Sequence, residues 1–193
     1  MKLLEFEFKG ERDYVHGTDM VNKFLNLFQN ADSLSIKIRK ITTENLYLVK
    51  EINDSKLVAS LVLNSGENNS EKFYLVESGT EAKGRYPYNE EELVESAQID
   101  LDSETVEMKT DNSYTLVENI VALHKKLVTK AISSDVKWLF VELKLNLIPK
   151  KMEKNDSLSI NIEKKLGVKL VESGILFNNK NIGFIRFSSI NKG

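Results

Sequence analysis

The sequence predicts an α+β protein made of two similar halves, each with one long amphipathic helix and an antiparallel sheet. The 193-residue chain contains two helical stripes of apolar residues, and each stripe is followed by four segments in which apolar and polar residues alternate. Alternation with a period of two is typical of strands that bury one face. A shift of 100 residues also brings the two halves into register.

The first half begins with a strand predicted at 6–9, and an amphipathic helix follows it. Its apolar residues recur at i, i+3, i+4 and i+7, as one buried helix face requires. They are Met20, Val21, Phe24, Leu25, Leu27 and Phe28. Alternation then predicts an antiparallel meander of four strands, at 33–41, 44–52, 56–64 and 71–78. Short polar turns separate these strands, and one of them is 53–55.

The second half repeats this order of elements. Strands are predicted at 98–102 and 105–109, and the helix at 115–132 has the apolar phase of the first helix. Four further strands are predicted at 138–148, 157–165, 169–178 and 181–189. The strands that begin KLVAS and KLVES share KLV-x-S literally. Matching order and phase favour a two-copy duplication over a chance alignment.

The duplication predicts three segments along the chain. They are a first repeat at 1–78, a linker with a short helix at 79–97, and a second repeat at 98–193. Glycine and proline break the structure in the linker, and NEEELVES reads as a short helix with Asn89 as its N-cap.

Composition excludes several classes of function. The chain has no cysteine, so thiolate catalysis, thiol-ligated zinc and disulfides are excluded. A formal net charge of −2 and the absence of a basic block give no attraction to nucleic acid. Charges interrupt MKLLEFEFKG, and no apolar run approaches the roughly 18 residues of a membrane span. Nucleotide-binding glycine motifs and paired histidines are missing, so we expect a cytoplasmic protein without cofactor or metal.

A long helix that follows a strand and is then wrapped by an antiparallel sheet resembles the hot-dog fold. Two copies in one chain resemble a double hot-dog, and the resemblance rests on element order and the internal repeat. It implies binding of acyl thioesters of coenzyme A or acyl carrier protein, with the acyl chain beside the central helix. The activities it implies are thioester hydrolysis and dehydration of β-hydroxyacyl groups. Several fused members of this fold have kept only one of their two sites.

His16, in YVHGTDMVNKF, is the first candidate site residue. It lies just before the helix, where the resemblance places the catalytic histidine of the dehydratases, although the prolines of their motif are missing here. A neutral imidazole can remove a proton or activate water near pH 7, and the N–H groups of a helix start can polarise a thioester carbonyl. The alternative is an exposed histidine ahead of a helix that Thr18 or Asp19 caps.

Four neighbours of His16 complete the predicted site in the first half. Asp19 could act as a general base, as an acidic residue near the helix start does in some hot-dog thioesterases, or it could complement the helix dipole. Asn22 lies one turn further along the same face and could orient water. Tyr14 and Gly17 adjoin the helix start and are predicted to contact substrate, although the recurrence of Tyr14 as Tyr114 also suits a structural role.

The second half carries a different set of residues at its helix start. Leu116 matches His16, so the imidazole is not duplicated. Glu118 stands one residue before the position of Asp19, and it could supply a catalytic acid to a shared site or simply cap its helix. His124 falls within the apolar stripe, so we expect it to be buried without a catalytic role.

These observations lead to two functional hypotheses. The first is an enzyme that hydrolyses or dehydrates acyl thioesters of the fatty-acyl or polyketide type, with His16 as base and with Asp19 or Glu118 as acid or water-orienting group. The second is a non-catalytic binding or assembly module of the same fold whose site has degenerated. Either could form a homodimer of such fused pairs, because hot-dog sheets often pair further.

Overall fold

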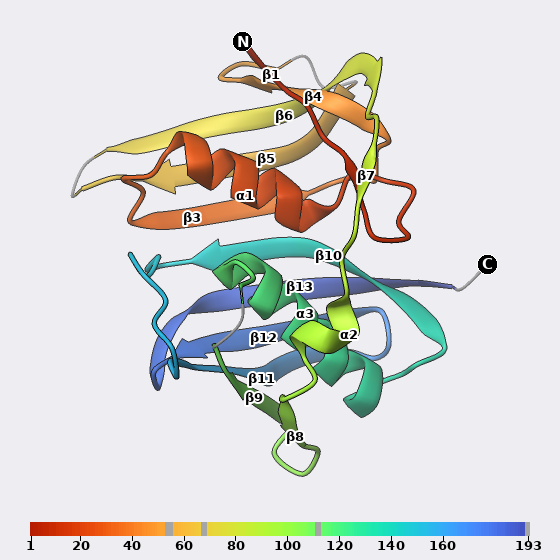
Figure 1. Cartoon of the computed structure of the whole chain (residues 1–193), viewed down its shortest axis with the longest axis vertical. Coiled ribbons are helices and arrows are strands. Elements are labelled where there is room, and N and C mark those ends of the chain that lie inside the picture. The colour runs from red at the N-terminus through yellow and green to blue at the C-terminus, as the bar shows by residue number, and fades with distance from the viewer. Residues whose placement is uncertain (53–55, 67–68, 111–112, 192–193) are drawn as a thin grey trace. The chain divides into compact units, whose positions relative to one another are not determined.

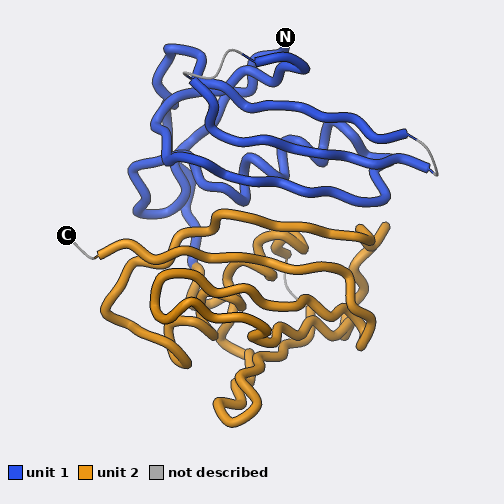
Figure 2. Tube along the Cα trace, turned by 180° about the vertical axis from the view of Figure 1, so that it is seen from behind, with its two compact units in different colours: residues 1–89 blue, residues 90–193 orange. Residues whose placement is uncertain are grey.

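The chain divides into two compact units, residues 1–89 and residues 90–193 (Figure 2). The computed structural model describes residues 1–52, 56–66, 69–110 and 113–191. The turn predicted at 53–55 lies outside these residues. Among the described helices, none combines the length and the apolar character that crossing a membrane requires.

Unit 1 pairs one helix with an antiparallel sheet (Figure 1). Its sheet strands are β1 (Lys2–Leu4), β3 (Ser33–Ile38), β4 (Glu44–Val49), β5 (Leu57–Asn64) and β6 (Ser70–Glu81), and they lie in the order β1-β4-β6-β5-β3. The four strands predicted after the helix are therefore confirmed. They do not form the predicted meander, because β4 pairs with β6 and not with β5. Alternation shows which side chains are buried, but it does not show which strands are neighbours.

The first predicted strand, at 6–9, is wrong as a member of this sheet. The strand that pairs with β4 is β1, four residues nearer the N-terminus. Phe6 leaves the sheet because its backbone N–H donates to the Asn45 side chain at 2.7 Å. The next residues form β2 (Phe8–Lys9), which pairs in parallel with β7 (Arg85–Tyr86) in a separate two-stranded sheet. The chain thereby brings Lys9 and Tyr86 side by side.

Helix α1 (Gly17–Leu27) buries the predicted stripe against its sheet. Met20, Val21 and Phe24 are fully buried. At the C-terminal end, Phe24 packs edge-on to Phe73 of β6, with ring centroids 5.4 Å apart. Phe28 lies 4.8 Å from the same ring and completes an aromatic cluster between helix and sheet.

Unit 2 has its own sheet, helix α2 (Glu90–Leu93) and the longer helix α3 (Leu116–Ala131). Its strands are β8 (Gln98–Asp100), β9 (Thr105–Lys109), β10 (Val136–Leu145), β11 (Ser157–Leu166), β12 (Leu170–Phe177) and β13 (Lys180–Asn191), and their order is β10-β13-β12-β11-β9-β8. The predicted meander is confirmed for β11, β12 and β13. The strand after the helix, β10, instead pairs with the last strand, β13.

His124 lies in the core of unit 2, as its place in the apolar stripe predicts. The residue is fully buried on α3, and its ring meets Phe187 edge-on with centroids 4.5 Å apart. Neither ring nitrogen has a hydrogen-bond partner among the described residues. Burial among apolar groups lowers the pKa of the His124 imidazole from 6.5 to about 3. The folded protein therefore keeps this imidazole neutral.

This buried imidazole makes the folded state sensitive to acid. Below pH 6.5 the unfolded chain binds a proton at His124 and the folded chain does not, so stability falls as pH decreases toward the folded pKa of about 3. We expect His124→Phe to remove this contribution, which amounts to about 2 kcal/mol between pH 7.5 and pH 5. Urea unfolding of both proteins at the two pH values measures the difference. Equal losses of stability in the two proteins would contradict it.

Candidate functional site at the start of α1

His16 is the N-cap residue of α1, with extended backbone angles of φ −80° and ψ 139°. The helix begins at Gly17, so the alternative in which Thr18 or Asp19 is the N-cap is wrong. His16 is 7% exposed and is therefore buried, which also excludes the exposed pre-helix residue of that alternative. Its Nδ1 lies 2.7 Å from the hydroxyl oxygen of Thr18. The imidazole is held against the first turn of its own helix.

Lys9 brings a positive charge into the same place. The side chain of this β2 residue has no exposed surface. Its ammonium donates to Thr18 Oγ1 at 3.1 Å and to Asp19 Oδ1 at 3.3 Å. It also lies 4.2 Å from the centre of the Tyr88 ring. A buried ammonium is tolerated only with such partners, because removal from water is otherwise very costly.

Asp19 is the anion of this cluster. Its Oδ1 accepts hydrogen bonds from Lys9 and, at 2.8 Å, from the hydroxyl of Tyr86 in β7. The Thr18 hydroxyl lies 3.3 Å from the same oxygen. The position of Asp19 in the first turn of α1 also suits the helix dipole. The other oxygen, Oδ2, is buried and has no hydrogen-bond partner among the described residues.

A tight turn lets the segment that carries the tyrosines reach Lys9. Gly10 has a φ of +57°, which favours glycine, and a Cβ at this position would lie 3.1 Å from the Tyr88 carbonyl oxygen. The Gly10 N–H donates to the Tyr86 carbonyl at 3.0 Å. The Arg85 guanidinium donates to the carbonyls of Gly10 and Arg12. These bonds fix β2 and β7 at the helix start.

The remaining predicted residues of unit 1 lie around this cluster. The half-buried Tyr14 ring is 6.2 Å from the His16 ring, measured between centroids. Gly17 is buried as the first residue of α1, and Asn22 is half-buried one turn after Asp19. The structure thus gathers five of the six predicted residues at one helix start. It adds Lys9, Thr18 and Tyr86, which the sequence did not single out.

Glu118, the sixth predicted residue, lies at the start of α3 in unit 2. Its backbone N–H donates to Thr115 Oγ1 at 3.2 Å, and its carboxylate accepts from the Thr115 backbone at 2.9 Å. This is a capping box, which satisfies donors at the helix start. The start of α3 therefore has a capped helix where α1 has a histidine and a buried charge cluster.

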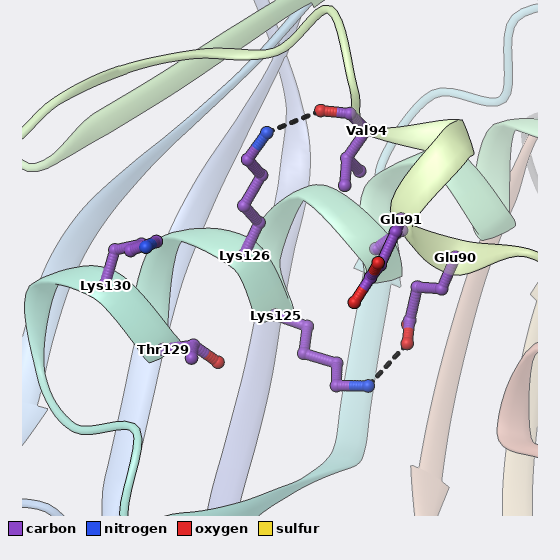
Figure 3. A pocket seen from close by; sticks show the side chains of 8 residues that line it. Glu90, Glu91, Val94, Lys125, Lys126, Thr129 and Lys130 are labelled. Carbon is purple, nitrogen blue, oxygen red and sulfur yellow. Dashed lines mark hydrogen bonds and ion pairs between the residues drawn. The ribbon is translucent and has the colours of Figure 1, made fainter.

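A pocket of about 320 Å³ lies elsewhere in unit 2, between α2 and α3 (Figure 3). Lys125 forms an ion pair with Glu90, and Lys126 donates to the Val94 carbonyl at 2.6 Å. Lys130 belongs to the last turn of α3, where a cation complements the helix dipole. These interactions account for the lysines as groups that dock α2 on α3, and the pocket lining includes no histidine.

A charged row also crosses the sheet of unit 2. Arg186 of β13 contacts Glu142 of β10 at 2.6 Å and forms an ion pair with Glu172 of β12. Lys164 of β11 extends the row with a 2.7 Å contact to Glu172. The hydrogen bond from Lys164 holds the pKa of the Glu172 carboxyl below its ordinary value. All are neighbours across adjacent strands, so the row is explained by cross-strand pairing.

Within the described ranges, no three histidine or acidic side chains come together in a way that could hold a metal ion. The candidate site at the start of α1 is thus an acid–base cluster: one imidazole, one carboxylate, one ammonium and two hydroxyls. Such a cluster can accept and orient protons and can present helix N–H groups to a carbonyl.

The fold is found in solved structures, whereas sequence comparison finds no relative. No protein-family profile matches the chain. No curated protein matches it in sequence. A tesB protein of Mycobacterium avium subsp. paratuberculosis is 8% identical with a TM-score of 0.54, and the match covers 99% of this chain and 92% of that one. This likeness establishes the hot-dog fold, which confirms the resemblance drawn from the sequence.

Two further similar structures have lower TM-scores. The dehydratase domain of PpsC from Mycobacterium tuberculosis, solved in complex with C12:1-CoA, is 6% identical with a TM-score of 0.49, and the match covers 92% of this chain and 85% of that one. An acyl-ACP thioesterase from Bacteroides thetaiotaomicron is 10% identical with a TM-score of 0.47, and the match covers 98% and 97% of the two chains.

Lys9 is expected to be essential for stability because it is the cation of the buried cluster. Lys9→Met leaves the Asp19 carboxylate buried without its counter-ion, which costs about 3–5 kcal/mol. Lys9→Met combined with Asp19→Asn removes both charges and should recover part of this loss. Urea unfolding of the single and double variants measures both effects.

Lys50→Met is the matched control. Its ion pair with Glu71, also in unit 1, is solvent-exposed, so the expected loss is below about 1 kcal/mol. An effect of Lys9→Met as small as that of Lys50→Met would show that the buried pair does not stabilise the start of α1.

Proposed function

We propose that the protein is an acyl-thioester enzyme with its active site at the start of α1. The observation that carries the proposal is the buried His16, which is linked through Thr18 to a buried carboxylate that Lys9 holds. The substrate class comes from the hot-dog fold, whose members, as the sequence resemblance implies, act on acyl groups of coenzyme A or acyl carrier protein. We propose the chain as a double hot-dog, with repeats at 1–78 and 98–193 and a linker at 79–97.

In this proposal each group at the helix start has a chemical task. His16 is the general base that takes a proton from water or substrate. The N–H groups of the first residues of a helix lack intrahelical acceptors, so those of Gly17 and Thr18 polarise the thioester carbonyl. Glycine at position 17 lets a ligand approach the backbone closely. Asp19 Oδ2, buried and with unused lone pairs, orients the attacking water. Tyr14 and Asn22 border the substrate.

Hydrolysis fits these groups better than dehydration does. In hydrolysis, His16 takes a proton from water as the water oxygen bonds to the carbonyl carbon. The carbon–sulfur bond then breaks, and the thiolate leaves with that proton. Dehydration also needs an acid that protonates the departing β-hydroxyl group. Asp19 is paired with the Lys9 ammonium and is therefore held as a carboxylate, which cannot donate a proton.

A panel of acyl-CoA and acyl carrier protein thioesters tests the proposal. We expect the wild type to release free thiol from at least one of them, and His16→Ala to lower kcat by about 10²–10⁴-fold, as loss of a general base does. His124→Phe is the matched control, because it removes the only other histidine, which lies in the core of unit 2. Its rate should stay near that of the wild type.

The outcomes of the panel separate the hypotheses. Loss of a β-hydroxyacyl group as water, with no thiol released, would replace hydrolysis by dehydration. Binding of acyl thioesters without turnover of any would contradict the enzyme and support the binding module. Full activity of His16→Ala would leave the reaction class in place and remove the base.

Asp19 and Glu118 remain the two candidates for the acting carboxylate, and two variants separate them. We expect Asp19→Asn to lower kcat by about 10²-fold, since an acid–base contribution is lost. Glu118→Gln should retain most activity and cost about 1 kcal/mol of stability through its weakened capping box. Steady-state kinetics with parallel urea unfolding measures both. The reverse pattern would assign the catalytic role to Glu118.

A further inference from the structure

The Thr18 hydroxyl is the only link between His16 and the charged pair in this network, and its oxygen has three polar neighbours. Lys9 Nζ lies at 3.1 Å, His16 Nδ1 at 2.7 Å and Asp19 Oδ1 at 3.3 Å. A threonine hydroxyl has one proton to donate and two lone pairs with which to accept. Three neighbours therefore use its full capacity, provided that two of them donate and one accepts.

The chemistry of two neighbours fixes the role of the third. An ammonium can only donate, so Lys9 occupies one lone pair of Thr18. An ionised carboxylate can only accept, so the hydroxyl proton points to Asp19. The remaining lone pair then accepts from His16, which requires a proton on Nδ1. If the hydroxyl pointed to His16, the oxygens of Thr18 and Asp19 would face each other at 3.3 Å with no proton between them.

We propose that Thr18 is a positioning residue that passes the charge of Asp19 to His16 and holds the neutral imidazole as its Nδ1–H tautomer. The lone pair then belongs to Nε2, the nitrogen remote from Thr18. Under the proposed function, on which only this catalytic consequence rests, Nε2 is the atom that takes the proton. The order of groups is carboxylate, hydroxyl, imidazole, so the hydroxyl stands where a direct carboxylate–imidazole bond orients the base in other enzymes.

Lys9 and Tyr86 keep this chain of hydrogen bonds in one direction. Both donate to Asp19 Oδ1, at 3.3 Å and 2.8 Å, and neither leaves the carboxylate free to turn toward His16. Thr18 itself has no exposed surface, so bulk water does not compete for its hydroxyl. The tautomer is thus set by buried groups from β2, α1 and β7.

The tautomer can be measured without any substrate. In a His124→Phe background the ¹⁵N-labelled protein has one histidine, and long-range ¹H–¹⁵N spectra at about pH 8, above the ordinary imidazole pKa of roughly 6.5, report which nitrogen carries the proton. We expect Nδ1–H with Thr18, a shift toward Nε2–H in Thr18→Val, and a return to Nδ1–H in Thr18→Ser, which restores the hydroxyl. Thr110→Val is the matched control, a buried threonine of unit 2 that should leave the spectrum unchanged.

A second variant covers the case in which Thr18→Val fails to fold. Asp19→Ala combined with Lys9→Met removes both charges and keeps the hydroxyl, which can then donate to Nδ1 and favour Nε2–H. An Nε2–H tautomer with Thr18 present, or spectra that neither variant changes, would overturn the proposal. A protein that shows Nδ1–H but consumes no thioester would contradict the proposed function and leave the role of Thr18 intact.

Discussion

The buried ammonium of Lys9 is the constraint on which the candidate site depends. A lysine without exposed surface must find its partners inside the protein, and here they come from three separate segments. Thr18 and Asp19 belong to the first turn of α1, and the rings of Tyr86 and Tyr88 belong to a segment far along the chain. The charge of one side chain thereby fixes how β2, α1 and β7 meet.

The starts of α1 and α3 show what this constraint changes. At α3 the Thr115 side chain and Glu118 satisfy the helix donors in a capping box, which is the ordinary use of a threonine and an acid at these positions. At α1 the N-cap is His16, whose side chain makes no capping bond. The threonine and the acid that could cap this helix bind Lys9 instead. Capping has been given up there in favour of a network that orients an imidazole.

The sequence predicts what depends on local pattern and misses what depends on partners. Alternation and the helical stripe report burial, so the strands after each helix, both helices and the burial of His124 could be predicted. Strand neighbours could not, because the pairing of β4 with β6 buries the same side chains as a meander would. His16 and Asp19 stand out beside a helix start. Lys9 does not, because a lysine is buried only where tertiary structure supplies its counter-charge.

Stability alone does not account for this network. A buried ion pair is on average no more stabilising than apolar residues of the same volume, since the cost of removing both charges from water offsets their attraction. The cluster also holds a buried carboxylate oxygen with no hydrogen-bond partner among the described residues, which is a further cost. Apolar residues and a capped α1 would fold at lower cost. Buried polar groups whose hydrogen bonds are incomplete concentrate at sites that bind or transform a ligand. The start of α1 is where the fold of this chain accepts such a cost, and the imidazole of His16 is the group that benefits from it.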